Sequence, residues 1–133
     1  MSAFVDTSAL LAVLDLADQD HAAAAATLRS LLDADEDLVT SNYVLVETFA
    51  LVQSRLGLGA IRLLQQDLVP ILRVAWLDED AHRAAVTALL TASRRRLSLV
   101  DCSSFETMRR FGITRAFAFD GHFAEQGFEL VTA

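Results

Sequence analysis

Apolar, β-branched and aromatic runs alternate along this chain with longer segments in which apolar residues recur at helical spacing. The short runs predict strands at residues 3–5, 38–40, 72–76, 116–119 and 128–131. About thirty to forty residues separate each of the first four strands from the next, which leaves room for crossover helices and is far more than a hairpin needs. The pattern therefore predicts a mainly parallel sheet with helices between its strands.

The helical segments predict helices at residues 8–14, 20–32, 42–55, 59–68, 79–94 and 103–110. Asp20 and Asn42 can cap helix N-termini. Gly57 and Gly112 suit the left-handed conformation that ends many helices. The connection over residues 120–127 is too short for an ordinary crossover helix, so the direction of the last strand stays open.

The size and hydrophobicity of the chain predict one compact α/β domain over residues 1–133, because 53% of the residues are hydrophobic. No apolar stretch reaches the roughly 20 residues that a membrane-spanning helix needs. The N-terminus also lacks the basic start and long apolar run of a signal peptide. We therefore expect a cytoplasmic protein with no membrane partner.

The net charge of −7 argues at first against a nucleic-acid partner, because phosphate backbones usually select basic proteins. The charge is unevenly distributed, since seven of the eleven basic residues lie within residues 81–115, around Asp101. All eleven are arginines, whose forked guanidinium binds phosphate oxygens through paired hydrogen bonds. Codon bias in a GC-rich genome is the other explanation for the missing lysines. An RNA partner therefore stays open.

Glu47 is the only charged residue in the almost wholly apolar helical segment at residues 42–52. Its helical neighbours include Val44 and Leu51, so its carboxylate shares a hydrophobic stripe. Burying a carboxylate alone costs several kcal/mol or forces its protonation. Glu47 therefore predicts a cation, a proton or a base at the place to which this stripe points.

Three further acidic residues follow apolar runs: Asp6, Asp101 and Asp120. In open parallel sheets, ligands collect at the carboxyl ends of the strands, so these side chains are expected at one edge. Each also has a structural interpretation, because Asp6 and Asp101 could cap the helices that follow and Asp120 could form a turn with Gly121. Together with Glu47, however, the acidic residues predict a metal site.

Carboxylates gathered within a few ångströms repel one another and need a divalent cation to stay ionised. The single cysteine excludes an internal disulfide, and the three scattered histidines form no zinc motif. The ligands are therefore expected to be oxygen atoms, which favours Mg²⁺ or Mn²⁺. The natural reaction for such a cluster is phosphodiester hydrolysis, in which the metal activates a water and neutralises charge on the phosphate.

Four segments carry a resemblance to a known family. In chain order they read FVDTSALL, NYVLVETFALV, LSLVDCSSFETMRRFGI and AFAFDGHFAEQGFELV. The chain resembles the PIN domain, and specifically the VapC-type ribonuclease toxins of bacterial toxin–antitoxin pairs, over essentially its whole length. The third and fourth segments are the most specific, and the acidic pattern of the family is intact.

This resemblance implies a three-layer α/β/α fold with Mg²⁺- or Mn²⁺-dependent endoribonuclease activity on single-stranded or looped RNA. It also implies a homodimer and inhibition by a small cognate antitoxin. Carried over by position, the acidic site of the family falls on Asp6, Glu47, Asp101 and Asp120. Asp6 and Asp101 are the expected direct metal ligands. Glu47 and Asp120 would bind through water, complete a second site or orient the nucleophile.

Other polar residues near these motifs have both a functional and a structural interpretation. The hydroxyls of Thr7, Ser8 and Ser103 could hold a metal-bound water or contact a phosphate, although helix capping is the default for each. The arginine triplet could bind RNA or complement the dipole of a helix C-terminus; it consists of Arg94, Arg95 and Arg96.

His122 and Cys102 lie beside two of the acidic residues. His122 could act as a general base, but a partly buried turn histidine is the preferred interpretation because metal-activated water needs no imidazole base. Cys102 is expected to be a small core residue and not a nucleophile.

Other enzyme classes fit the sequence less well. Phosphotransfer receivers and haloacid-dehalogenase-like phosphatases also place aspartates around magnesium, but they usually rely on a lysine, which this chain lacks. The sequence contains neither Gly-x-Ser-x-Gly nor a P-loop motif. The serious alternative is a catalytically inactive PIN-like module that binds RNA or a protein partner. The intact acidic residues argue against it.

Overall fold

The protein forms a five-stranded sheet in a computed structural model that describes residues 1–92 and 97–131. Its strands are β1 (Ser2–Val5), β2 (Asp37–Ser41), β3 (Arg73–Ala75), β4 (Arg115–Phe117) and β5 (Glu129–Leu130). The strand order is β3-β2-β1-β4-β5, and every neighbouring pair is parallel. The predicted parallel sheet is therefore confirmed, with β1 at its centre.

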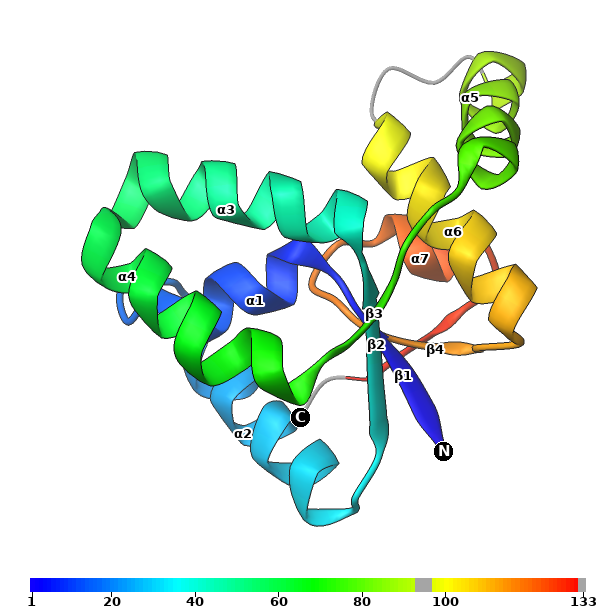
Figure 1. Ribbon diagram of the computed structural model, residues 1–133. Coiled ribbons are helices and arrows are strands. Elements are labelled where there is room, and N and C mark those ends of the chain that lie inside the picture. The colour runs from blue at the N-terminus through cyan, green and yellow to red at the C-terminus, as the bar shows by residue number, and fades with distance from the viewer. Residues whose placement is uncertain (93–96, 132–133) are drawn as a thin grey trace.

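Helices cover both faces of this sheet. They are α1 (Thr7–Leu14), α2 (His21–Asp33), α3 (Asn42–Leu56), α4 (Leu58–Leu63), α5 (Glu79–Ala92), α6 (Leu99–Phe111) and α7 (His122–Glu125). Helices α1 to α4 lie on one side of the sheet and α5 to α7 on the other, which confirms the three-layer α/β/α arrangement (Figure 1). Among the described residues, none of these helices has the length and apolar character that a bilayer crossing requires.

Two connections differ from a simple helix-and-strand pattern. The predicted helix at residues 59–68 begins as α4 and continues through a π-helical turn, Leu64–Leu68, followed by a 3₁₀ turn, Val69–Ile71. The short connection after β4 contains the single-turn helix α7, which returns the chain so that Glu129 pairs in parallel with Arg115. One helical turn is therefore sufficient for this crossover. The pairing shows that the last strand, whose direction the sequence left open, is parallel to β4.

The core is centred on β1 and on phenylalanines from the C-terminal quarter of the chain. Phe4 is fully buried and pairs in register with Val39 on β2 and with Ala116 on β4. The Phe123 ring, also fully buried, lies 6.3 Å from the Phe4 ring and 5.2 Å from that of Phe105 on α6. Aromatic packing of this kind contributes beyond its buried area, so it fixes α6 and α7 against β1.

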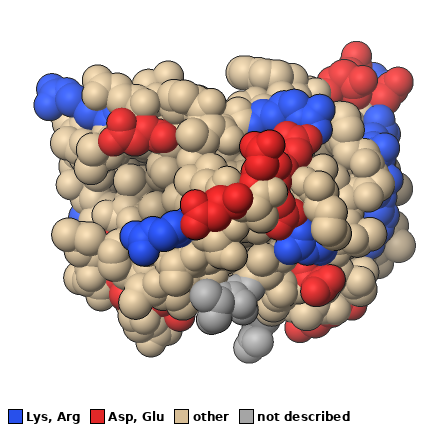
Figure 2. All heavy atoms as spheres, turned by 90° about the horizontal axis from the view of Figure 1, so that it is seen from below, with Lys and Arg blue, Asp and Glu red and all other residues tan. Residues whose placement is uncertain are grey.

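Charged residues at the amino ends of the strands are paired across elements. Arg73 at the start of β3 pairs with Asp37 at the start of β2, and Arg115 at the start of β4 pairs with Glu36. Figure 2 shows this end of the molecule from below, with acidic and arginine side chains next to one another. Acidic charge at this end is therefore balanced locally by arginines.

Candidate active site

Asp6 lies directly after β1 and caps the N-terminus of α1. Its Oδ2 accepts hydrogen bonds from the backbone N–H of Ser8 at 3.2 Å and from Ser8 Oγ at 2.7 Å. Ser8 Oγ accepts one from the backbone N–H of Phe119 at 3.0 Å, which links α1 to the segment after β4. Asp6 is only 4% exposed, so it is held rigidly at the carboxyl end of the central strand.

Glu47 lies on α3 and is half-buried. Hydroxyl groups hold α3 against the start of α1: Thr48 Oγ1 donates to Thr7 Oγ1 at 3.2 Å and to the Val44 carbonyl at 2.7 Å. Thr7 Oγ1 also donates to the Val44 carbonyl at 3.4 Å. Because Glu47 adjoins Thr48 on this helix, the contact places its carboxylate near the end of β1.

Asp101 comes from a different element than its apolar context suggested. The run before it is no strand, because α6 begins at Leu99 and Asp101 lies in its first turn. Ser98 is the N-cap, and the two residues form a capping box: Asp101 N–H donates to Ser98 Oγ at 3.0 Å, and Ser98 N–H donates to Asp101 Oδ2 at 3.1 Å. Asp101 is therefore not the N-cap that its structural interpretation predicted; the helix begins earlier, and Asp101 supports the cap from its third position.

Asp120 follows β4 and forms the predicted turn at Gly121. Its Oδ1 accepts a hydrogen bond from the backbone N–H of His122 at 2.9 Å, which starts α7. This bond uses one carboxylate oxygen to hold the turn.

A pocket of about 340 Å³ brings the acidic residues together. Its lining consists of Asp6, Thr7, Ser8, Leu11, Glu47, Leu51, Arg55, Ser98, Asp101 and Asp120. All four acidic residues that the sequence singled out therefore line one pocket, although they come from the β1–α1 junction, α3, α6 and the β4–α7 connection.

Burial and crowding disfavour the ionised carboxylates in this pocket. The pKa of Asp6 is raised from 3.8 to about 6. Burial is the main cause and the charges of Asp101 and Asp120 add to it, while the hydrogen bonds from Ser8 oppose it. Burial likewise raises the pKa of Asp101, and the charge of Asp120 adds to this, while hydrogen bonds from Ser98 and the proximity of His122 oppose it. These shifts are what acidic side chains show where a cation would be favourable.

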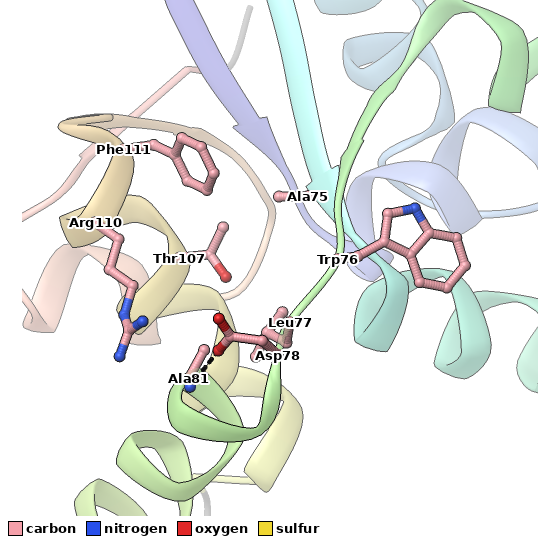
Figure 3. A pocket seen from close by; sticks show the side chains of 8 residues that line it. All are labelled: Ala75, Trp76, Leu77, Asp78, Ala81, Thr107, Arg110 and Phe111. Atoms are coloured by element: carbon pink, nitrogen blue, oxygen red, sulfur yellow. Dashed lines mark hydrogen bonds between the residues drawn. The ribbon is translucent and has the colours of Figure 1, made fainter.

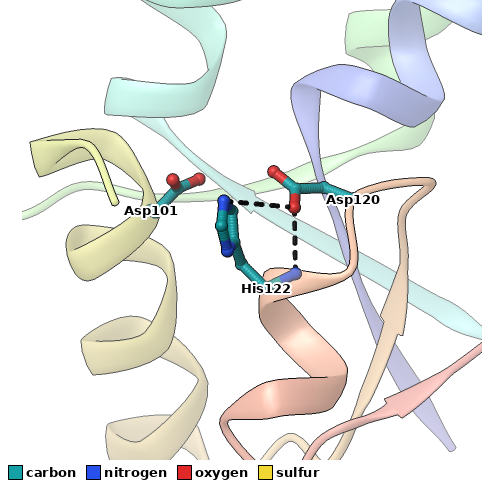
Figure 4. A group of neighbouring side chains, drawn as sticks. All are labelled: Asp101, Asp120 and His122. Atoms are coloured by element: carbon teal, nitrogen blue, oxygen red, sulfur yellow. Dashed lines mark hydrogen bonds and ion pairs between the residues drawn. The ribbon is translucent and has the colours of Figure 1, made fainter. Parts of the chain in front are cut away.

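His122 joins this group, which the sequence analysis did not predict. Asp101, Asp120 and His122 each present an atom able to bind a metal, and these atoms lie within 4.8 Å of one another (Figure 4). A ring nitrogen therefore lies beside the oxygen ligands that the sequence analysis expected. The histidine comes near Asp101 only through packing of α7 against α6, which no local spacing reveals.

Two other residues near the site have structural roles. Ser103 is fully buried, and its hydroxyl donates to the Val100 carbonyl at 2.6 Å, so it neither caps a helix nor reaches the pocket. Cys102 is buried as expected, and burial raises the pKa of its thiol, which disfavours a nucleophilic thiolate.

The arginines of the basic segment have local partners where the structure describes them. Arg110 pairs with Glu106 at 2.7 Å, and Arg109 donates to Gln126 at 3.0 Å and lies over the Phe128 ring at 5.5 Å. The triplet Arg94, Arg95 and Arg96 lies outside the described residues.

Arg55 and Ser98 also line the pocket, and the sequence analysis missed them. Arg55 follows Glu47 and Leu51 at successive intervals of four residues, so one stripe of α3 carries all three. This spacing was a usable signal for Arg55. The signal for Ser98 was its distance of three residues before Asp101, which matches a capping box.

Apolar side chains from α3 and from the residue after β3 form a second feature beside the pocket. We call Leu45, Val46, Phe49 and Trp76 the α3 apolar face; together with Asn42 they line a groove of about 380 Å³. Val46 is 71% exposed and Trp76 is 75% exposed. Trp76 also borders a smaller pocket of about 140 Å³ together with Thr107 and Phe111, and Figure 3 shows its ring turned away from those two residues.

Known proteins resemble this chain in sequence over nearly its full length. The sequence matches the PIN domain family over residues 3–129. It is 36% identical over 126 residues to the 23S rRNA-specific endonuclease VapC20 of Mycobacterium tuberculosis, a match that covers 94% of each protein. A segment of 56 residues is 48% identical to ribonuclease VapC26 of the same organism and covers 42% of this chain and 39% of that protein.

Solved structures resemble its fold. The crystal structure of M. tuberculosis VapC20, described as a sarcin–ricin loop cleaving toxin, aligns with a TM-score of 0.82 and 32% identity over 98% of this chain and 99% of that one. FitAcB from Neisseria gonorrhoeae aligns with a TM-score of 0.71 and 18% identity over 98% and 96% of the two chains, which shows likeness of fold alone. The chain therefore belongs to the PIN domain family and is homologous to the VapC-type toxins.

Proposed function

We propose that this protein is a Mg²⁺- or Mn²⁺-dependent endoribonuclease toxin that acts in the cytoplasm and is neutralised by a cognate antitoxin. One observation carries the proposal: the carboxylates of Asp6, Glu47, Asp101 and Asp120 line a single pocket. The raised pKa of Asp6 supports a role for a cation there, because a divalent ion would offset the burial and the repulsion that disfavour its ionised form.

The acidic residues fit a hard divalent ion. Asp6 and Asp101 are the proposed direct ligands, and Glu47 and Asp120 bind through water, complete a second position or orient the nucleophile. When bound, the ion supplies Lewis acidity toward a water and toward the phosphate. The hydrogen bonds from Ser8 and Ser98 hold the aspartates in place, which reduces the reorganisation required during the reaction.

Arg55 is the proposed contact to the RNA backbone. It is exposed, it is the single lysine or arginine that lines the pocket in the described part of the chain, and a guanidinium matches phosphate geometry. Ser8 lines the same pocket and is a further candidate. Phosphate contacts by Arg94, Arg95 and Arg96 stay a prediction, because these residues lie outside the described part of the chain. Ser103 is not proposed as an RNA contact, because its side chain is buried.

The first substrate to test is 23S ribosomal RNA. The relative VapC20, which matches 94% of this chain, is named as a 23S rRNA-specific endonuclease. Mapping RNA 5′ ends after brief expression would identify the cleaved RNA without assuming it. Transfer RNA and messenger RNA are the competing outcomes.

The acidic pocket also fits a basic side chain of an inhibitor. We propose that an arginine or lysine from the antitoxin occupies the metal position, because its charge can replace that of the cation. This places RNA and antitoxin in competition for one pocket.

We further propose that a second copy of the chain covers the α3 apolar face. Val46 and Trp76 are largely exposed there, and charged residues are absent from the described lining of the groove. A neighbouring groove that shares Val46 reaches Glu47, so this face adjoins the acidic pocket. A homodimer formed here would place its interface directly beside the site.

The purified protein should cleave ribosomal RNA with Mg²⁺ or Mn²⁺ and lose this activity in EDTA. Asp6→Asn and Glu47→Gln should each lower the rate by about a hundredfold or more, the scale on which losing one electrostatic contact to a transition state acts. Asp78→Asn is the matched control, because Asp78 caps the start of α5 outside the pocket. Cleavage that persists in EDTA would contradict the proposal, and metal-dependent RNA binding without cleavage would support the inactive-module alternative.

The stability of the metal-free protein should depend on pH through Asp6. Its folded-state pKa of about 6 lies above the ordinary 3.8, so the folded state holds the proton more tightly and stability falls as pH rises from about 4 to 6. The cost above pH 6 is roughly 3 kcal/mol of unfolding free energy. In EDTA, Asp6→Asn should therefore unfold at a higher temperature than the wild type at pH 8 but not at pH 4.

The control for this effect is Asp78→Asn, which removes the same charge from a helix cap elsewhere. A similar gain in that variant would assign the effect to net charge. Adding Mn²⁺ at pH 8 should stabilise the wild type and leave Asp6→Asn largely unchanged.

Co-expression with the neighbouring upstream gene should restore growth and give a stable complex. Glu47→Gln should weaken that complex at least about tenfold, since it removes one charge that faces the inhibitor cation. Calorimetric titration against the purified partner measures this, with Asp78→Asn as the comparison. Unchanged toxicity with the partner present, or equal affinity for both variants, would reject this mode of inhibition.

Val46→Glu should convert a dimer to a monomer, with dissociation at least about tenfold easier, because the new carboxylate would be buried at the interface. Sedimentation equilibrium at several protein concentrations gives the dissociation constant of the dimer. Leu58→Glu is the matched control, since Leu58 is 61% exposed on α4 at the other end of α3. A monomeric wild type, or equal effects of both substitutions, would rule out this interface.

A further inference from the structure

The imidazole of His122 lies beside two carboxylates of the pocket. Its Nε2 is 3.7 Å from Asp120 Oδ1, and Figure 4 shows the ring between Asp120 and Asp101. The possible ligand atoms of these three residues lie within 4.8 Å of one another. Two ligands on opposite sides of a small divalent ion lie about 4 Å apart, so small side-chain movements would close the set around an ion.

The position of His122 is fixed from two directions. Its backbone N–H donates to Asp120 Oδ1 at 2.9 Å, which ties the histidine to the turn that also places that carboxylate. The next residue, Phe123, is fully buried against Phe4 and Phe105. The imidazole is therefore held near the acidic pocket by the hydrophobic core and not by a mobile surface segment.

The other ring nitrogen, Nδ1, faces a carboxylate that could orient the imidazole for metal binding. His122 Nδ1 is buried without a hydrogen-bond partner among the described residues, and the nearest ion-pair oxygen is Glu125 Oε2 at 3.5 Å. Metal-binding histidines commonly donate their other ring N–H to a carboxylate, which fixes the tautomer. A proton on Nδ1 facing Glu125 would leave the lone pair of Nε2 directed toward Asp120.

We infer that His122 is a nitrogen ligand of a divalent metal position that it shares with Asp101 and Asp120, with Glu125 orienting its ring. This inference rests on the proposed function, because it assigns one ligand of the same metal-dependent site. It adds a ligand class that the sequence analysis excluded. The acidic residues alone would form an oxygen set, whereas the histidine gives the position mixed oxygen and nitrogen donors.

A nitrogen donor changes which ion the site prefers. Mg²⁺ binds oxygen and gives up its waters reluctantly, while imidazole suits first-row transition metals. The wild type should therefore bind Mn²⁺ in preference to Mg²⁺, and loss of the imidazole should reduce that preference by about tenfold, the lower end of effects reported for groups that tune a metal ligand.

The test uses Mn²⁺ alone as the probe, without RNA. Electron spin-echo spectroscopy of the Mn²⁺-loaded protein detects nitrogen-14 bound to the ion. The wild type should show this coupling and His122→Gln should lose it. The chain provides matched controls in its two other histidines, so His21→Gln and His82→Gln should keep the coupling. Glu125→Gln should keep the coupling but bind Mn²⁺ about tenfold more weakly.

The outcomes separate this inference from the proposed function. Mn²⁺ bound by the wild type with oxygen ligands only would overturn the assignment of His122 and leave a metal-dependent nuclease intact. Coupling that survives in His122→Gln would overturn it equally. A wild type that binds no Mn²⁺ would overturn both. Far-ultraviolet circular dichroism in EDTA checks that each variant is folded, and a conservative His122→Asn change gives a second test if the glutamine variant unfolds.

Discussion

Burial of crowded carboxylates at one edge of the sheet is the constraint on which the rest of this structure depends. Asp6 is almost fully buried after the central strand, and this burial, with a smaller contribution from the charges of Asp101 and Asp120, raises its pKa to about 6. Ionising Asp6 in the folded protein therefore costs free energy, and the fold does not compensate for it. The hydrogen bonds from Ser8 lower the pKa by less than burial raises it. A protein can retain such an arrangement if the pocket gains a cation during function.

The fold imposes this crowding through rigid elements. The central strand ends at Asp6, hydroxyl contacts hold α3 against the start of α1, and buried phenylalanines hold α6 and α7 against the same strand. Each acidic side chain therefore lies in, or within a few residues of, an element fixed by the core, and none depends on a long loop. The same packing that stabilises the fold prevents the carboxylates from moving apart.

The sequence predicted the residues of the pocket better than it predicted their surroundings. Glu47 could be found because a lone charge in an apolar helix has no structural reason, and Asp6 because it ends a strand. Asp101 was identified from an apolar run that forms no strand, and the capping-box spacing from Ser98 was the better signal. Ser103 was misjudged because α6 begins at Leu99, which turns that side chain into the core.

His122 could not have been found in the same way. Its distance to Asp120 is local, but its approach to Asp101 requires α6 and α7 to pack together through Phe105 and Phe123. Tertiary contacts of this kind leave no periodic pattern in a sequence. The parallel direction of β5 was open for a related reason, since only the structure shows that the single turn of α7 is sufficient for the crossover.

Acidic residues are paired with arginines at the amino ends of the strands and clustered in a pocket at the carboxyl ends. This difference explains how an acidic protein could act on RNA. At the amino ends, arginines pair with Asp37 and Glu36, so that charge has little effect at a distance. At the carboxyl ends, the pocket gathers its carboxylates around one arginine in the described lining, Arg55. On the proposed function, such a pocket would repel phosphate until a divalent ion enters, and without the ion it would attract the basic side chain of an inhibitor. On the proposed function, the occupant of this pocket therefore decides between RNA cleavage and inhibition, and the net charge of the chain has little influence on that choice.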